Sequence, residues 1–151
     1  MTMLSKLINV VVASSNIFGL TAVYKLMSEN NYGPYYLKII SVTTMTLASF
    51  FMHISETKHG LPGALLSKYC NYFLWFDRIL AYLFGAFVLV KLFYNPNLAT
   101  GEYLAKGLTG VSLNLISEHI FKSNKRSSQI MFMITHSIWH YIAYACLAEI
   151  I

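Results

Sequence analysis

Three histidines in the sequence stand at positions that suit a metal site. His136 and His140 are four residues apart, and His53 lies in a distant part of the chain. Side chains four residues apart lie on one face of a helix, so His136 and His140 form a chelating pair if their segment is helical. Three imidazoles are also the ligand set of catalytic zinc sites that keep one position open for water. We therefore treat these three histidines as candidate zinc ligands.

Two further polar residues stand near the candidate ligands in the sequence pattern. Ser49 precedes His53 by four residues, and Asp77 lies within the first two turns of the next apolar segment, 72–93. Zinc lowers the pKa of a bound water from about 15.7 to about 7 and so supplies a nucleophile at neutral pH. Asp77 is then a candidate to hold that water and accept its proton. Ser49 is a candidate to orient a ligand or to stabilise developing charge.

The composition around these residues is that of a membrane protein. Of 151 residues, 56% are hydrophobic, 15% are aromatic and only 11% are charged, whereas a soluble domain usually has about 25% charged residues. Disordered chains are poor in apolar residues, so this composition excludes disorder. The net charge of +5 comes from basic residues spread singly along the chain, which argues against nucleic acid as a partner. The partners expected are membrane lipids.

The apolar residues gather into five segments that approach the length of a membrane crossing, about 20 residues. These segments are 7–24, 39–54, 72–93, 103–121 and 130–151. They predict an all-α integral membrane bundle of about five transmembrane helices in a single domain, 1–151. The first segment has a short basic head like that of a signal peptide, but its apolar character continues through 17–23, which favours a retained helix.

Five crossings would place the two chain ends on opposite sides of the membrane. Seven basic residues then fall on the N-terminal side, and four fall on the other. The first group is Lys6, Lys58, Lys68, Arg78, Lys122, Lys125 and Arg126, and the second is Lys25, Lys38, Lys91 and Lys106. Because positive charge is enriched on the cytosolic side, the N-terminus and the loops 55–71 and 122–129 are predicted to be cytosolic.

This topology places the candidate residues at similar depths. The segment 39–54 ends at the cytosolic side with His53, and the segments carrying Asp77 and the histidine pair begin there. At about 1.5 Å per residue from position 130, His136 and His140 lie about 9 and 15 Å deep. By the same rise, Ser49 lies about 6 Å deeper than His53. All five residues are therefore expected to share one layer in one half of the bilayer.

The combined pattern resembles the signature of the CREST superfamily, which includes alkaline ceramidases, adiponectin receptors and the myomaker-like branch. The resemblance covers five positions on three helices, and the family has seven helices where five are predicted here. It implies that zinc is held by His53, His136 and His140, with Asp77 beside the water and Ser49 beside a ligand. It also implies hydrolysis of a lipid acyl or amide bond.

The same residues also admit purely structural roles. His53 could bind water at a helix end, and Asp77 could form a local charge pair with Arg78 that reaches the interface. The histidine pair of the last segment could be hydrogen-bonded within the core. Ser49 could bond to its own backbone or pack against a neighbouring helix.

Two other classes of function remain open. A haem-binding membrane anchor would use histidines on different helices, such as His53 with His136 or His119 with His140. An accessory or structural subunit of a larger membrane complex, or a homo-oligomer, would satisfy its polar residues at helix interfaces, and the aromatic content suits lipid or partner surfaces. Within the hydrolase hypothesis, His119 could replace His53 as the third ligand, and Glu118 could serve as a base.

Overall fold

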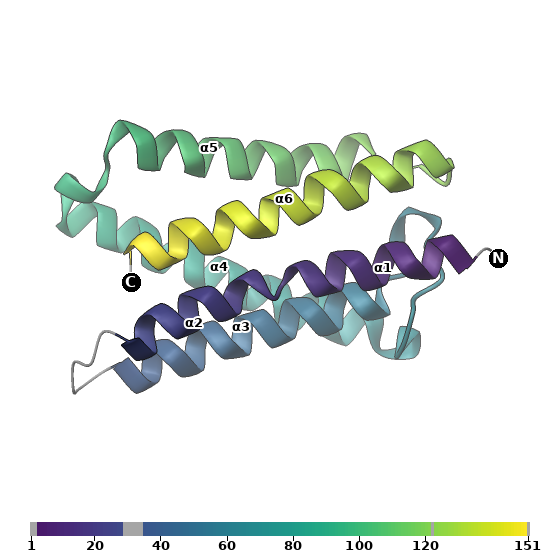
Figure 1. Cartoon of the computed structure of the whole chain (residues 1–151), viewed down its shortest axis with the longest axis horizontal. Coiled ribbons are helices and arrows are strands. Elements are labelled where there is room, and N and C mark those ends of the chain that lie inside the picture. The colour runs from purple at the N-terminus through teal and green to yellow at the C-terminus, as the bar shows by residue number, and fades with distance from the viewer. Residues whose placement is uncertain (1–2, 29–34, 122, 151) are drawn as a thin grey trace.

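The computed structural model describes residues 3–28, 35–121 and 123–150, and its regular elements within them are all helical (Figure 1). The α-helices are α1 (Met3–Ser15), α2 (Phe18–Ser28), α3 (Tyr35–Ser55), α4 (Cys70–Tyr94), α5 (Gly101–Leu115) and α6 (Arg126–Ile150). Short 3₁₀ turns lie at Lys58–Gly60, Ser67–Tyr69 and Pro96–Leu98, and a π-helical turn, Ile116–Ile120, follows α5. The prediction of an all-α fold is confirmed.

Four helical stretches of the described chain are long and apolar enough to cross a membrane. They are Lys6–Ser28, Tyr36–Ser55, Ser67–Tyr94 and Arg126–Ile150. α5, which occupies most of the predicted span 103–121, is not among them. Its α-helical part ends at Leu115 after only 15 residues, and Lys106, Ser112 and Asn114 lower its apolar character. The fifth predicted crossing, 103–121, is therefore the one whose length and composition fall short of a membrane-spanning helix.

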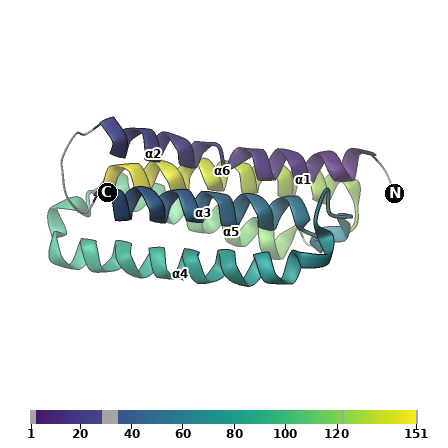
Figure 2. The ribbon, with the colours of Figure 1, turned by 90° about the horizontal axis from the view of Figure 1, so that it is seen from below.

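The helices pack on one another in a spatial order that differs from the chain order. α5 packs on α6, α6 packs on α1 and α2, these two pack on α3, and α3 packs on α4. Figure 1 shows α5 at one edge of the bundle, and Figure 2, turned by 90°, shows α4 at another. α1 and α2 thus pack on both α3 and α6, the two helices that carry the candidate ligands.

The first predicted span, 7–24, is not one continuous helix. Backbone hydrogen bonds from Asn16 N to Ala13 O (3.1 Å) and from Ile17 N to Ser14 O (3.0 Å) form a tight turn between α1 and α2. The buried Asn16 side chain stabilises this turn, because it accepts a hydrogen bond from Tyr144 Oη of α6 at 3.0 Å. The break between α1 and α2 therefore depends on Tyr144 in another helix, α6. The apolar pattern of the segment 7–24 contains no signal for this contact.

Gly19 of α2 allows close packing against α3 and α6. A Cβ atom there would collide with Thr46 Oγ1 and would lie 2.9 Å from Cε1 of Tyr144. We expect Gly19→Ala to lower the free energy of unfolding by about 1–3 kcal/mol, because overpacking strains the neighbouring side chains. The measurement is the thermal unfolding midpoint in detergent.

Gly85→Ala is the matched control, because a Cβ at Gly85 on α4 would meet no heavy atom within 4 Å. This variant should unfold at the same temperature as the unmodified protein or higher, since alanine is the better helix former by about 0.5–1 kcal/mol. Equal midpoints for Gly19→Ala and Gly85→Ala would show that Gly19 is not required for close packing.

The loop after α3 folds back over the end of that helix. The backbone N–H groups of Ala64 and Leu65 donate to Ile54 O at 2.8 and 3.0 Å, and Gly63 permits the turn with φ +66°. Asn9 Nδ2 of α1 donates to the carbonyl oxygen of Glu56 at 2.6 Å. These contacts bury Glu56, although it belongs to a polar segment of the sequence.

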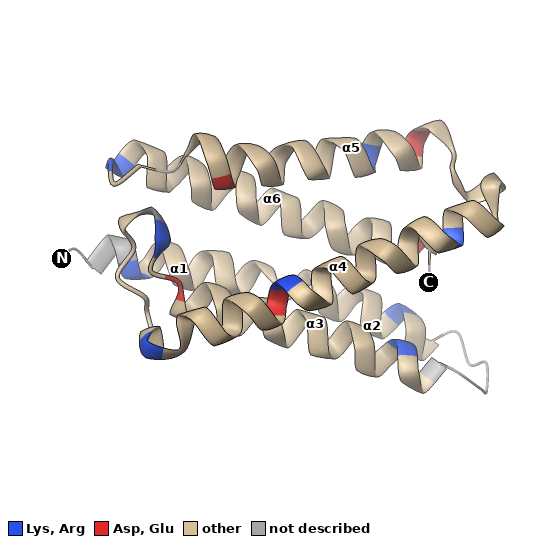
Figure 3. Ribbon diagram, turned by 180° about the vertical axis from the view of Figure 1, so that it is seen from behind, with Lys and Arg blue, Asp and Glu red and all other residues tan. Residues whose placement is uncertain are grey.

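The charged residues lie mostly toward the two ends of the bundle (Figure 3). α4 differs, because it carries an acid and a base side by side within its length, and these are Asp77 and Arg78. Asp77 is half-buried, whereas Arg78 is exposed. The acid and the base therefore face different surroundings.

Candidate metal centre

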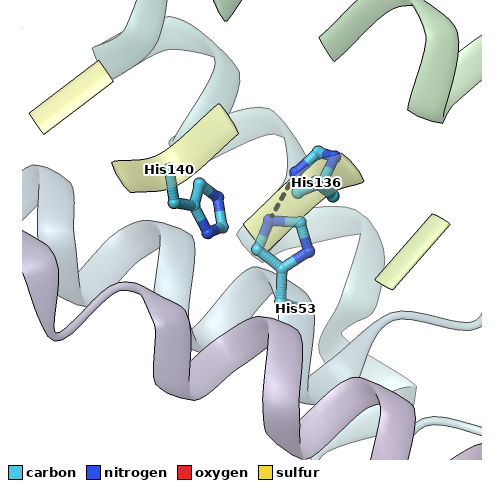
Figure 4. Close-up of side chains that lie close together, drawn as sticks. All are labelled: His53, His136 and His140. Atoms are coloured by element: carbon cyan, nitrogen blue, oxygen red, sulfur yellow. Dashed lines mark hydrogen bonds between the residues drawn. The ribbon is translucent and has the colours of Figure 1, made fainter. Parts of the chain in front are cut away.

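His53, His136 and His140 meet between α3 and α6 (Figure 4). One nitrogen of each ring lies within 4.8 Å of the corresponding nitrogens of the other two, and the side chains are only 1%, 4% and 4% exposed. The two histidines of α6 are one helical turn apart and face the end of α3. Three buried imidazoles in this arrangement could hold one metal ion.

Serine hydroxyls from two other elements contact the Nδ1 atoms of the α6 histidines. We call Nδ1 the outer nitrogen of each ring and Nε2 the inner nitrogen. Ser15 Oγ of α1 lies 2.7 Å from His140 Nδ1, and Ser117 Oγ of the π-helical turn lies 2.8 Å from His136 Nδ1. Each hydroxyl donates its single hydrogen to the carbonyl oxygen three residues earlier, at 2.6 and 2.8 Å. We assign the ring hydrogen to Nδ1 in both histidines, because a serine that donates to its carbonyl oxygen is then an acceptor for the imidazole.

Glu56 likewise contacts the outer nitrogen of His53. Its Oε2 lies 3.0 Å from His53 Nδ1, and the glutamate side chain is only 2% exposed. An ionised carboxylate can only accept hydrogen bonds, so Nδ1 of His53 also carries the hydrogen. Metal-binding histidines commonly donate their outer N–H group to a carboxylate or another oxygen, which fixes the ring and makes the inner nitrogen more basic.

These assignments leave Nε2 of every neutral imidazole with a lone pair and no hydrogen. The Nε2 atoms of His53 and His136 are 3.1 Å apart, which is a hydrogen-bonding distance, so without a cation one of the two rings must carry a second hydrogen and donate it to the other (Figure 4). A metal ion could take the place of this hydrogen and bind both Nε2 atoms. Two nitrogens bound to one tetrahedral zinc at about 2.05 Å would be about 3.3 Å apart, which is close to the observed spacing.

The π-helical turn Ile116–Ile120 places two consecutive polar residues toward His136. Besides the Ser117 contact, Glu118 Oε1 lies 3.9 Å from His136 Nδ1, and its Oε2 lies 3.6 Å from Lys58 Nζ. The next residue, His119, is exposed and is not among the three clustered histidines. The structure thus brings Glu118 beside the cluster and places His119 away from it.

Ser49 and Asp77 border the cluster without belonging to it. Ser49 Oγ is buried and lies 3.5 Å from His140 Nε2, at the outer limit of a hydrogen bond. The half-buried Asp77 carboxylate of α4 interacts electrostatically with both Ser49 and His53. The serine and the aspartate therefore lie where α3 and α4 meet, beside the three imidazoles.

Sequence reasoning missed the three residues that hold the outer nitrogens. None of the three is a candidate in the sequence, because Glu56 falls in the predicted loop 55–71 and the two serines, Ser15 and Ser117, lie within apolar segments. A signal for Glu56 was present, because residues three apart lie on one helical face. Ser15 and Ser117 could not be recognised, because each meets a histidine of a different helix.

Replacing Glu56 should weaken metal binding. We expect Glu56→Ala to lower the affinity about 10–100-fold, because removal of an outer partner of a metal ligand typically has this effect. Glu56→Gln should lose less, since its amide oxygen can still accept the hydrogen of His53 Nδ1. Competition with a chromophoric chelator in detergent measures the affinity.

The matched control for this experiment is Glu102→Ala. Glu102 is an exposed carboxylate of α5 that pairs with Lys106, far along the chain from all three histidines. It should leave the metal affinity unchanged. Equal affinities for Glu56→Ala and the unmodified protein would contradict the assigned role of Glu56.

Comparison with known proteins gives no relative of this chain. No family model, curated protein or solved structure matches it. The function of the site is therefore inferred from the chemistry of its own residues.

Proposed function

We propose that this protein is an integral membrane, zinc-dependent hydrolase of a lipid acyl or amide bond. The observation that carries the proposal is the convergence of three buried imidazoles whose outer nitrogens are all hydrogen-bonded to Ser15, Glu56 and Ser117. Such a network makes each inner nitrogen a lone-pair donor.

The apolar surface supports a membrane setting. Large side chains along α4, such as Trp75, Tyr82 and Leu89, are 64%, 73% and 70% exposed. In water, so extensive an apolar surface would mark an interaction site, whereas in a bilayer it faces lipid. The proposal includes α5 as a fifth, more polar crossing and a cytosolic N-terminus, as the distribution of basic residues predicts.

The histidines fit one metal ion better than haem. A porphyrin between two axial imidazoles separates their nitrogens by two metal–nitrogen bonds, about 4 Å if each is near 2.0 Å. His53 and His136 have Nε2 atoms only 3.1 Å apart, and His119, a candidate haem ligand, is exposed. Zinc is the proposed ion because three neutral imidazoles and one open position are its usual catalytic environment.

Asp77 and Ser49 would supply the proton chemistry. Zinc, when bound, polarises a carbonyl group and lowers the pKa of water. Asp77 would accept a proton from the attacking water and deliver it to the leaving oxygen or nitrogen. The C–O or C–N bond then breaks, and the products are a fatty acid and an alcohol or amine. Ser49 would hold the Asp77 carboxylate in position through its hydroxyl group.

The location of the site suits a lipid substrate. His53 lies two residues before the end of α3, and Asp77 lies within the first part of α4. The site therefore lies toward one membrane face, where the ester and amide groups of lipids meet the acyl region. Membership of the CREST superfamily is part of this proposal, since it implies the same residues and reaction class.

The proposal is tested by metal analysis and lipid hydrolysis on the same detergent-purified protein. We expect about one zinc per chain and no Soret band. We also expect fatty acid to be released from a panel of ceramide, glycerophospholipid and ester substrates, measured by mass spectrometry. Chelation should stop the release, and added zinc should restore it.

Three results would overturn the proposal. A Soret band would indicate haem, and the absence of both metal and haem would leave the histidines as packing groups of an accessory subunit. Zinc binding with no hydrolysis of any substrate would contradict the proposed reaction.

A further inference from the structure

α3 and α4 enclose an elongated apolar cavity beside the metal centre. Its volume is about 410 Å³, and its lining includes Met45 and Ser41 of α3 and Leu80, Phe84 and Phe87 of α4. Ser41 and Phe87 are exposed, so the cavity opens to the surface of the bundle as a groove. We call it the α3–α4 groove.

The groove leads directly from the residues proposed for the chemistry. Asp77 precedes Leu80 by three residues, Phe84 by seven and Phe87 by ten, and these spacings place all four on one face of α4. Ser49 follows Met45 by four residues on α3, which is the same relation. The groove therefore begins about one helical turn from Ser49 on α3 and from Asp77 on α4.

The direction of the groove is that of a lipid chain in the leaflet nearest the site. On α3 the groove extends from Met45 to Leu37, and Lys38 near its far end is 11 residues from Ser49, which corresponds to about 16 Å along the helix axis. The site lies toward one end of α3, and the groove runs from it toward the opposite end. A lipid with its carbonyl at the site would direct its acyl chain along this path.

We propose that the α3–α4 groove binds one acyl chain of the substrate and holds its carbonyl group at the three histidines. This inference rests on the proposed function for the position of the carbonyl. The volume lies near the lower limit of small-molecule pockets, about 300–1,000 Å³, so it suits one chain rather than two. The substrate class is a lipid with a single long acyl chain in the cleaved position.

Selection by the groove depends on shape. Lipid tails are as apolar as leucine, so transfer of a chain from the bilayer into the groove gains little hydrophobic free energy. Lys38 lines the far end and would place a polar group against the methyl end of a longer chain. The groove should therefore select chains by length, with an upper limit set near Lys38.

Photolabelling tests the groove without requiring hydrolysis. The full chain is reconstituted in phosphatidylcholine nanodiscs and labelled with palmitic acid that carries a terminal diazirine, and the adducts are mapped by mass spectrometry. We expect adducts of the terminal diazirine to concentrate at the far end of the groove, at 37–41 and 84–87, and to decrease with excess unlabelled palmitate. Uniform labelling of exposed α4 residues such as Trp75 and Leu89, without competition, would overturn the proposal.

Two variants give the matched comparison. Ser41→Trp fills the groove and should lower groove adducts about ten-fold, because overpacking of this kind costs roughly one decade of binding. Ala86→Trp adds the same side chain at an exposed α4 position that does not line the groove, and its labelling should not change. Equal labelling of the two variants would overturn the proposal.

The labelling and hydrolysis experiments test the groove and the proposed reaction separately. Competed labelling of the groove in a protein that hydrolyses no lipid would support the groove and overturn the proposed function. Hydrolysis together with uncompeted labelling would overturn only the groove. If both hold, Ser41→Trp should shift the preferred substrate toward shorter chains, and an unchanged preference would contradict the assigned path.

Discussion

Replacing His136 and His140 together by alanine is expected to reduce the metal content from about one ion per chain to none. One remaining imidazole cannot retain an ion that three held together, and the Ser15 and Ser117 hydroxyls are poor substitutes as ligands. The measurement is elemental analysis of the purified variant beside the unmodified protein. Undiminished metal content in the variant would show that the histidine cluster is not the binding site.

Two companion variants separate metal loss from misfolding. His53→Gln retains a polar side chain of similar size on α3 and should also lose the metal, while circular dichroism reports whether the helices remain. His119→Ala removes an exposed histidine outside the cluster and should retain the full metal content. A further readout is the unfolding temperature, which added zinc should raise in the unmodified protein but not in the double variant, because a ligand stabilises only the state that binds it.

The candidate ligands could be predicted from sequence because their placement follows from regular features. The rise of a helix and the alternating direction of successive helices are enough to place His53, His136 and His140 at a similar level along the bundle. Their lateral approach depends on how α1 and α2 pack on both α3 and α6. The level along the bundle could be predicted from sequence, but the lateral contact could not, and the depth in a membrane stays a prediction.

The surroundings of the ligands were less predictable, because they arise from contacts between elements. Glu56 is charged and follows a helix, so its sequence context suggests a solvated loop. It is buried because the loop folds back on Ile54 and because Asn9 of α1 binds its carbonyl oxygen. Such a contact between residues 47 positions apart has no local signal.

The helix boundaries were also less predictable from sequence, because they too depend on contacts between elements. Apolar windows located the spans, but the turn at Asn16 depends on Tyr144, and the π-helical turn after Leu115 departs from the regular helix assumed for 103–121. π-helical turns often occur at functional sites, where they redirect side chains. Here the turn places Ser117 beside His136, so this irregularity contributes a contact to the histidine cluster.

Asp77→Asn is expected to lower the rate of lipid hydrolysis about 10²–10⁴-fold while leaving the metal content unchanged. The amide retains the size of the side chain and an oxygen that can accept from Ser49, but it cannot take up a proton from water. Losses of this size are typical when a general base is removed. Asp77 is not among the three clustered residues, so the metal should remain bound.

Arg78→Gln is the control that decides between the two roles considered for Asp77. If Asp77 serves mainly as a charge partner of Arg78, removal of either charge should have a similar and small effect on hydrolysis. If Asp77 is the base, Arg78→Gln should retain most of the activity, because Arg78 is exposed while Asp77 faces Ser49 and His53. Similar rates for the two variants, with metal bound in both, would assign Asp77 a structural role and remove it from the reaction.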